Sequence, residues 1–301
     1  MKYSKDKLKE LYSFLINSFF YMFRRKQLLV YGYVKVKNGK VVRSNWGDDL
    51  NVYLLELLTG YNVIVANRSL YHILFKKRGF LCIGSILGFV GNKNSVVWGT
   101  GSLGYAQPIL SEIPSRICSV RGPMTKELLE SKGHRCPEIY GDPALLLSKY
   151  YMPSHNKKYR MGIVPHVSQK NEKFINDFAD KHEDVVIIDL KSYTLWTDVI
   201  DQINSCEFII SSSLHGLIVA DSYKIPNVWI KFPLRLAGDN FKFCDYLKSV
   251  HRDVNLPIEI FSVEDLEKIY CRIDIKYEAI IDYSMILESC PFKHLLSSPL
   301  Y

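Results

Sequence analysis

The sequence predicts an α/β fold of two domains built from alternating strands and helices, with further helices at the C-terminus. In both halves of the 301-residue chain, short apolar β-rich runs alternate with helix patterns. A polar, proline-containing stretch at 151–158 separates the two halves and lacks any periodicity. We therefore expect an N-terminal amphipathic helix at 1–27, domains at 28–150 and 160–250, and a helical segment at 251–301.

The first half begins with an apolar strand and continues through short β-rich runs. Strands are expected at 28–34, 61–66, 80–86, 95–98, 116–120 and 138–140. Helices are expected at 48–58, 123–131 and 144–147. Gly60 ends the first of these helices, while Pro123 and Gly133 mark the start and the end of the second.

The second half alternates more regularly, which indicates a parallel, doubly wound sheet. Strands are expected at 161–164, 184–190, 208–211 and 227–232. Helices are expected at 171–181, 194–205, 214–223, 241–250, 263–273 and 277–287. Four consecutive β-branched apolar residues, 185–188, are typical of a strand buried on both faces.

The charge and cysteine content limit the partners. There are 39 Lys and Arg against 31 Asp and Glu, a formal charge of +8. This excess suits phosphorylated metabolites or a membrane face, or it is a mildly basic surface with no partner. Nucleic acid is disfavoured because no basic stripe with interleaved aromatics occurs. The seven scattered cysteines form no CxxC pair or Cys/His cluster, so we expect reduced thiols in the cytoplasm and no metal.

The N-terminus carries an apolar run at 11–23 between basic residues. This run is too short to span a bilayer, which needs about 20 apolar residues. No small-residue cleavage site follows it, which disfavours a signal peptide. We expect an amphipathic helix that either packs on the protein or makes a peripheral contact with an anionic membrane through residues 1–26.

Candidate catalytic residues follow the strands of the second half, where parallel sheets bind ligands. The turn Ser211-Ser212-Ser213-Leu214-His215-Gly216 places three hydroxyls and an imidazole at the start of a helix. There His215 is suited to proton transfer, since an unperturbed imidazole has a pKa near 6.5. His166 follows the first strand and is the second candidate. Each histidine would otherwise be a residue that only bonds a neighbouring loop.

Strand ends of the first half supply further candidates. Arg121 lies between a strand and a helix, where a guanidinium can grip a carboxylate or phosphate, although a surface ion pair is the alternative. Other polar residues at such turns are expected to line the cleft or bind an acceptor. They are Asn45, Trp46, Asp48, Asp49 and Thr100.

Five segments, taken in this order, resemble the polysaccharide pyruvyl transferase family. They are Asn45-Trp46-Gly47-Asp48, Gly99-Thr100-Gly101, Ser119-Val120-Arg121-Gly122-Pro123, Gly141-Asp142-Pro143 and Ser211-Ser212-Ser213-Leu214-His215-Gly216-Leu217-Ile218-Val219-Ala220-Asp221. The resemblance spans roughly residues 28–250 and its last segment is the most specific. Residues 238–246 also look like those of bacterial members that decorate surface polysaccharides.

This resemblance implies transfer of the enolpyruvyl group of phosphoenolpyruvate, a co-substrate, to a sugar of an exopolysaccharide or capsule precursor, giving a pyruvate ketal. It implies that His215 is catalytic and that Arg121 binds the donor, helped by the hydroxyls of 211–213. Many relatives carry an Arg two positions before the histidine, where this chain has Ser213. The cations that could replace it are Lys231, Arg235 and Lys242.

The resemblance also implies two Rossmann-like domains that face each other across a cleft, as in GT-B enzymes. It implies that the acceptor is a lipid-linked oligosaccharide at the inner face of the cell membrane. No resident cofactor is expected. Two other functions fit the same architecture, because a fold alone does not decide function. One is a GT-B glycosyltransferase that uses a nucleotide sugar. The other is a non-catalytic protein of polysaccharide assembly that binds an anion or a sugar.

Overall fold

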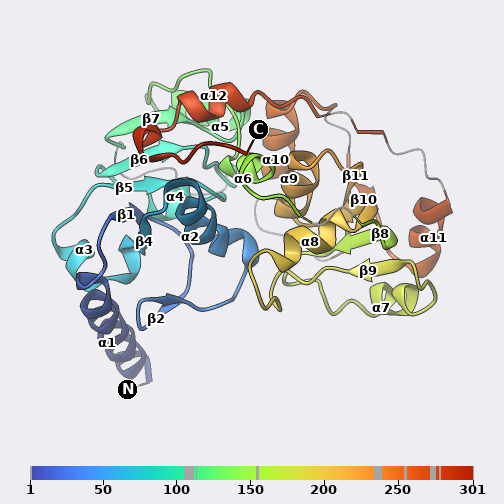
Figure 1. Cartoon of the computed structure of the whole chain (residues 1–301), viewed down its shortest axis with the longest axis horizontal. Coiled ribbons are helices and arrows are strands. Elements are labelled where there is room, and N and C mark those ends of the chain that lie inside the picture. The colour runs from blue at the N-terminus through green and yellow to red at the C-terminus, as the bar shows by residue number, and fades with distance from the viewer. Residues whose placement is uncertain are drawn as a thin grey trace.

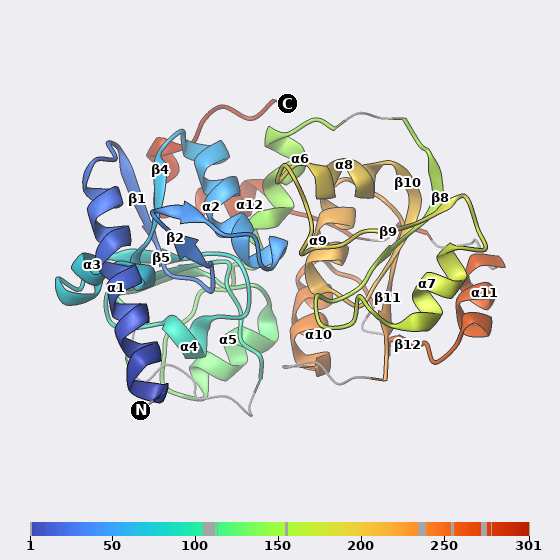
Figure 2. The ribbon, with the colours of Figure 1, turned by 90° about the horizontal axis from the view of Figure 1, so that it is seen from below.

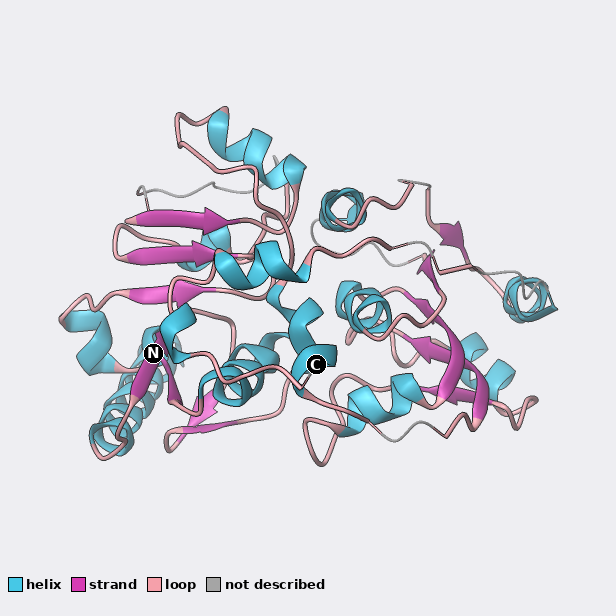
Figure 3. Cartoon of the chain, turned by 45° about the horizontal axis from the view of Figure 1, so that its top comes forward, coloured by secondary structure: helices cyan, strands magenta, loops and turns pink. Residues whose placement is uncertain are grey.

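The computed structural model describes residues 2–104, 112, 114–153, 156–233, 239–253, 256–271, 276–277 and 279–300. Two five-stranded parallel sheets occupy the two halves of the chain and lie apart in both ribbon views (Figures 1 and 2). Helices connect most successive strands and lie on both sides of the sheets (Figure 3). The predicted α/β class with parallel sheets is confirmed.

The first sheet has the strand order β4-β1-β5-β6-β7, with every neighbouring pair parallel. Its strands are β1 Gln27–Val30, β4 Asn62–Val65, β5 Gly79–Leu81, β6 Ser95–Trp98 and β7 Arg116–Ser119. The predicted strand at 80–86 is too long, because the chain turns after Leu81 and Gly84 takes a φ of +100°. The predicted strand at 138–140 is only an isolated bridge between Val120 and Tyr140.

The helices of the first half include one before the sheet and others between and after its strands. They are α1 Lys2–Met22, α2 Trp46–Thr59, α3 Leu70–Leu74, α4 Leu87–Val90, α5 Pro123–Glu130 and α6 Leu147–Tyr150, with 3₁₀ turns at Ala66–Arg68 and Pro143–Leu146. Helix α2 ends as predicted at Gly60, whose φ of +65° lets its N–H bond the carbonyl of Glu56. The sequence analysis did not predict α3, α4 or the antiparallel hairpin β2 Val36–Lys37 and β3 Lys40–Val41.

The second sheet has the strand order β12-β11-β10-β8-β9 and is also parallel throughout. Its strands are β8 Tyr159–Val164, β9 Val185–Ile187, β10 Cys206–Ser211, β11 Asn227–Lys231 and β12 Ile258–Glu259. Its helices are α7 Lys173–Ala179, α8 Asp198–Asn204, α9 Leu214–Ser222, α10 Asp239–Ser249 and α11 Val263–Cys271. Helix α8 starts later than predicted because the Asp198 carboxylate accepts the backbone N–H groups of Thr194 and Leu195, which form a turn.

Apolar residues cover both faces of each sheet. One face of the second sheet packs on α7 and α11 through a cluster that includes Phe178, Phe208 and Leu266. Its other face belongs to a larger cluster that continues into the first half and contains Leu54 and Ile209. The two halves therefore share a core and hold their facing edges in fixed positions.

The C-terminal tail returns to the first half. It consists of α12 Tyr283–Glu288, which is shorter than the predicted helix at 277–287, and a 3₁₀ turn at Lys293–Leu295. The indole N–H of Trp98 donates to the carbonyl of Ile286 (3.1 Å), and Phe292 packs edge-on against Trp98. The tail thus helps to fix β6, whose carboxyl end faces the second half.

Candidate active site

A cavity of about 190 Å³ lies between the two halves. Its walls come from α2, from the loops after β5 and β8, and from the starts of α9 and α10. The residues that line it are Tyr33, Asn45, Asp48, Gly84, Ser85, Ile86, Phe89, Leu103, His166, Ser213, Leu214, His215 and Lys242. This is the edge at which parallel sheets present their carboxyl ends, as expected for a ligand site.

The turn after β10 places His215 in the first turn of α9. Ser213 is the N-cap residue, with an extended backbone (φ −103°, ψ 130°), and its side chain makes no capping bond. The hydroxyl of Ser211 accepts the N–H of Ser213 (3.0 Å) and lies 2.9 Å from the carbonyl oxygen of Val164. Ser212 accepts the N–H of His166 (3.0 Å). Of the three predicted serines, only Ser213 therefore lines the cavity. The hydroxyls of the other two form hydrogen bonds between the end of β10 and the end of β8.

His215 is enclosed on one side by α2. A side chain at Gly47 would overlap the imidazole ring at Nδ1, so the ring packs directly on the helix backbone. Its Nε2 is buried and has no hydrogen-bond partner among the described residues. Burial lowers the pKa of His215 to about 3, and the positive charge of Lys242 adds to the effect. At neutral pH the ring is thus uncharged and can accept a proton at a free nitrogen.

Asp48 contributes a carboxyl group to the cavity from α2, the helix that packs on His215. Burial raises its pKa to about 6, and the neighbouring charge of Asp49 contributes to the rise. Asn45 donates a hydrogen bond of 2.8 Å to its Oδ2. Asp48 and His215 are consequently a pair whose pKa values are shifted in opposite directions, an arrangement suited to acid and base roles in one site.

Lys242 brings a positive charge into the cavity from α10. Its side chain is only 9% exposed, and the ammonium lies 5.4 Å from the centre of the Phe243 ring. Burial and this charge lower the pKa of His166 to about 4. The Nδ1 of His166 lies 2.8 Å from the hydroxyl of Ser168. The cavity thus combines one buried cation with two histidines that are neutral at pH 7.

Arg121 does not line the cavity. It is fully buried, and its Nε donates to Oδ2 of Asp245 at 2.9 Å. Its other two nitrogens donate to the hydroxyl of Ser85 (2.5 Å) and to the carbonyl of Ser102 (2.8 Å). The predicted site residue therefore lies behind the wall, where it connects a lining serine to α10, the helix that carries Lys242.

The other predicted residues of the first half divide in the same way. Asn45 and Asp48 line the cavity, whereas Trp46, Asp49 and Thr100 are fully buried behind it. The indole of Trp46 donates to the carbonyl of Trp196 (2.7 Å) in the second half. Of the other cations, Lys231 ends β11 outside the lining, and Arg235 lies outside the described residues.

Several residues that line the cavity were not predicted from the sequence. The missed residues are Tyr33, Gly84, Ser85, Ile86, Phe89 and Leu103. Gly84 and Ser85 fall inside a stretch that was predicted to be one strand, because apolar residues surround them. The pair of small residues was the feature that could have indicated a turn there.

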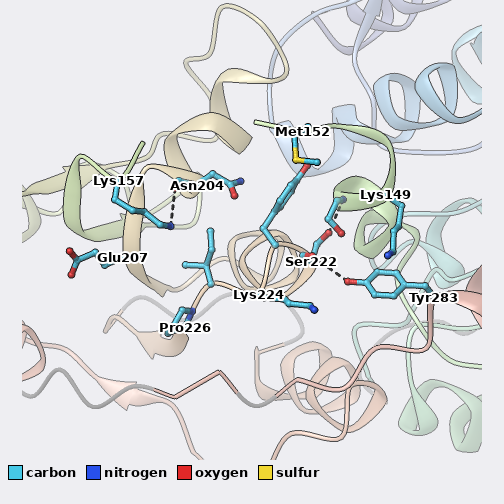
Figure 4. A pocket seen from close by; sticks show the side chains of 12 residues that line it. Lys149, Met152, Lys157, Asn204, Glu207, Ser222, Lys224, Pro226 and Tyr283 are labelled. Carbon is cyan, nitrogen blue, oxygen red and sulfur yellow. Dashed lines mark hydrogen bonds between the residues drawn. The ribbon is translucent and has the colours of Figure 1, made fainter. Parts of the chain in front are cut away.

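A second, larger pocket of about 460 Å³ lies at the opposite edge of the second sheet. Its lining includes Pro226, just before β11, and Glu207, at the start of β10. Lys149 and Lys224 also line this pocket (Figure 4). Lys157 donates a hydrogen bond to the carbonyl of Asn204 (2.9 Å). It contains none of the predicted site residues and lies at the amino ends of these strands.

The amino-acid sequence of the chain is similar to those of known proteins. Residues 85–231 match the family described as Polysaccharide pyruvyl transferase. The chain is 31% identical over 255 residues to "Uncharacterized protein L143" of Acanthamoeba polyphaga mimivirus, which covers 82% of this chain and 79% of that protein. It is 29% identical over 225 residues to "Succinoglycan biosynthesis protein ExoV" of Rhizobium meliloti (strain 1021), covering 69% of this chain and 62% of the relative. No solved structure matches. The chain belongs to the polysaccharide pyruvyl transferase family, whose role is pyruvyl transfer in polysaccharide biosynthesis.

Proposed function

We propose that this protein transfers the pyruvyl group of phosphoenolpyruvate to two hydroxyls of a sugar in a surface-polysaccharide precursor, forming a cyclic ketal. One observation carries the proposal: a neutral imidazole, a carboxyl group of raised pKa and a buried ammonium meet in one cavity between the two halves. The family match supports pyruvyl transfer, and this set of groups fits the demands of that chemistry on an anionic donor.

The donor carries a carboxylate and a phosphate, so its site needs fixed positive charge. In this proposal Lys242 supplies it, together with the free N–H groups at the start of the nine-residue helix α9. Lys242 takes the place of the arginine that many relatives carry at the position of Ser213, since both residues line the same cavity. Arg121 then acts as a positioning residue that holds α10 through Asp245.

Protonated Asp48 gives its proton to the methylene carbon of the donor, which makes the neighbouring carbon electrophilic. His215 accepts the proton of the first sugar hydroxyl as that oxygen bonds to this carbon. An anionic donor beside Asp48 raises the pKa of the carboxyl further and so keeps it protonated at neutral pH. His166 serves as a neutral hydrogen-bonding group beside them.

The second stage breaks the bond between this carbon and the phosphate oxygen. The imidazolium of His215 returns its proton to the leaving phosphate, and the second hydroxyl closes the ring. The proton of that hydroxyl restores Asp48. The two hydroxyl protons thus end on the methyl group and on the phosphate, and both catalytic residues recover their starting forms without a resident cofactor or metal.

We also propose that the two halves act as two Rossmann-like domains in a GT-B-like arrangement, with the donor held between them. Both sheets direct the carboxyl ends of their strands to the cavity, which supports this arrangement. The acceptor would be a lipid-linked oligosaccharide, met at the cytoplasmic face of the membrane.

The test is incubation of the full chain with phosphoenolpyruvate and a panel of sugar acceptors, followed by mass detection. The expected product gains the mass of one pyruvic acid less one water, with release of phosphate, and a chelator leaves the rate unchanged. Consumption of a nucleotide sugar with phosphoenolpyruvate untouched would instead identify a glycosyltransferase. Saturable binding without turnover of either donor would identify a binding protein.

A further inference from the structure

Helix α1 is attached to the body of the protein by polar side chains together with the buried ring of Tyr21. The amide of Asn17 donates to the carbonyl of Arg68 (2.9 Å) and accepts the N–H of Gly39 (3.0 Å). Ser18 is buried and lies 3.0 Å from the hydroxyl of Ser69. A surface helix normally buries its apolar face, whereas the attached side of α1 combines polar hydrogen bonds with one buried aromatic ring.

The opposite side of α1 carries a row of large apolar side chains that face away from the protein. Its members, which we call the α1 stripe, are Leu8, Leu11, Tyr12, Leu15, Phe19, Met22 and Phe23. Each of them is more than half exposed. They recur at intervals of three and four residues, so they share one face of the helix. An unpartnered apolar face of this length marks an interaction surface.

Helix α3 adds to this surface. It lies beside α1 at one end of the molecule (Figures 1 and 2), and the N–H of Tyr71 donates to the hydroxyl of Ser18 (3.0 Å). Leu74 and Phe75 are more than 60% exposed. The exposed basic sequence Lys76-Lys77-Arg78 follows directly. The two helices therefore combine exposed apolar groups with positive charge.

The charges around the surface indicate what it contacts. Residues 2–26 contain seven basic residues and only Asp6 and Glu10 as acidic ones. A second copy of the chain would bring these like charges together, whereas anionic lipid headgroups attract them. Within the described part of the chain, no helix is long and apolar enough to cross a membrane. A basic helix with an exposed apolar face is suited to lie in the plane of a membrane surface.

We infer that α1 and α3 dock this protein on an anionic membrane, with the α1 stripe buried among the lipids and the basic residues against the headgroups. This inference does not depend on the proposed reaction. The two sides of α1 would then have different roles. One side holds the helix to the protein, while the apolar side is available to contact lipid.

The test is flotation of the full chain with vesicles of phosphatidylcholine alone or with added phosphatidylglycerol. We expect binding to the anionic vesicles, weakened by salt and by Leu11→Glu/Phe19→Glu. Lys76→Glu/Lys77→Glu should weaken it at least tenfold, since each basic residue contributes about 1 kcal/mol near the surface. Leu256→Glu, which changes an 83% exposed leucine in the second half, is the matched control and should leave binding unchanged.

Two results would overturn the inference. One is equal or absent binding to both kinds of vesicle. The other is a dimer in solution that the α1 variants convert to a monomer without changing vesicle binding, since a second copy would then cover the stripe. Unchanged unfolding temperatures of the variants, and unchanged turnover of a water-soluble acceptor, separate this test from failure of the fold or of the reaction.

Discussion

Two pockets lie at opposite edges of the second sheet, and the smaller one contains the titratable groups of the candidate site. The cavity between the halves measures about 190 Å³, whereas the pocket at the amino ends of β10 and β11 measures about 460 Å³. The larger pocket carries Lys149, Lys157 and Lys224 but no histidine. The smaller one brings together a carboxyl group of raised pKa, two neutral imidazoles and a buried cation. Shifted pKa values and converging polar groups thus identify the site better than its size does.

The two pockets also differ in how they are built. The small cavity is walled by both halves, so its residues are held by contacts across the molecule, such as the 2.7 Å bond from Trp46 to the carbonyl of Trp196. The larger pocket is lined by α6 of the first half, by residues at the amino ends of β10 and β11 and by Tyr283 of the tail, and its lysines extend around its rim. Substitutions should therefore have large effects in the first region and small ones in the second.

The largest effect is expected from His215→Ala. Loss of a positioned acid or base typically costs about 10²- to 10⁴-fold in rate, so kcat should fall by that amount while the protein stays folded. Lys224→Ala changes the larger pocket and is the matched control, with turnover close to that of the parent protein. Near-normal turnover of the histidine variant, measured with phosphoenolpyruvate and an accepted sugar, would remove His215 from the mechanism.

Arg121→Ala is expected to act on stability. It leaves Asp245 in the core without its positively charged partner, although Thr125 still donates to it, and this should lower the free energy of unfolding by about 3–5 kcal/mol. The partly exposed pair of Lys170 and Asp189 offers a comparison, since Lys170→Ala should cost about 1 kcal/mol or less. Denaturant titration measures both. An Arg121 variant of normal stability that needs far more phosphoenolpyruvate would show instead that the guanidinium contacts the donor.

Gly47→Ala tests the packing of the catalytic ring. The added methyl group overlaps the imidazole of His215 and must displace it. Because a misplacement of about 1 Å can cost about 10²-fold, kcat should fall by roughly that factor. Gly32→Ala is the control, as its added carbon meets its nearest neighbour at an ordinary 3.6 Å. Equal activity of the two variants would mean that the ring position does not matter.

The pH dependence of kcat/KM should reflect the protonation of Asp48. The proposed acid acts in its protonated form, and its pKa is raised to about 6, so kcat/KM should decline as the pH rises above that value. The pKa of His215, lowered to about 3, keeps the base neutral across this range. Asp48→Asn should lower kcat/KM and remove the decline. A rate that rises between pH 6 and 8 would indicate that the carboxylate acts as a base.

Much of the site followed from the order of strands and helices. The carboxyl ends of parallel strands share an edge, so residues after them, such as His215, His166 and Asp48 at the start of α2, could be expected to meet. The buried position of the Arg121 side chain could not be predicted in this way. Its partner Asp245 lies 124 residues away in the sequence, so tertiary packing determines the contact. The pKa shifts likewise depend on burial, which no local pattern specifies.

Other features were hidden for different physical reasons. The turn at Gly84 and Ser85 sits in an apolar run that reads as a continuous strand. The tail crosses back to the first half through single contacts, such as the 2.7 Å bond from the N–H of Ser297 to the carbonyl of Leu58. The outward apolar side of α1 has the same periodicity as a buried one, so only the structure distinguishes them.

The most direct measurement is calorimetric titration of phosphoenolpyruvate into the parent protein, Lys242→Ala and Lys224→Ala, with no acceptor present. A charge-assisted bond contributes about 1.5–3 kcal/mol, so Lys242→Ala should raise the Kd by roughly tenfold to a hundredfold, with Lys224→Ala unchanged. Weakened binding in the Lys224 variant together with a normal Kd in the Lys242 variant would move the donor to the larger pocket and contradict the account.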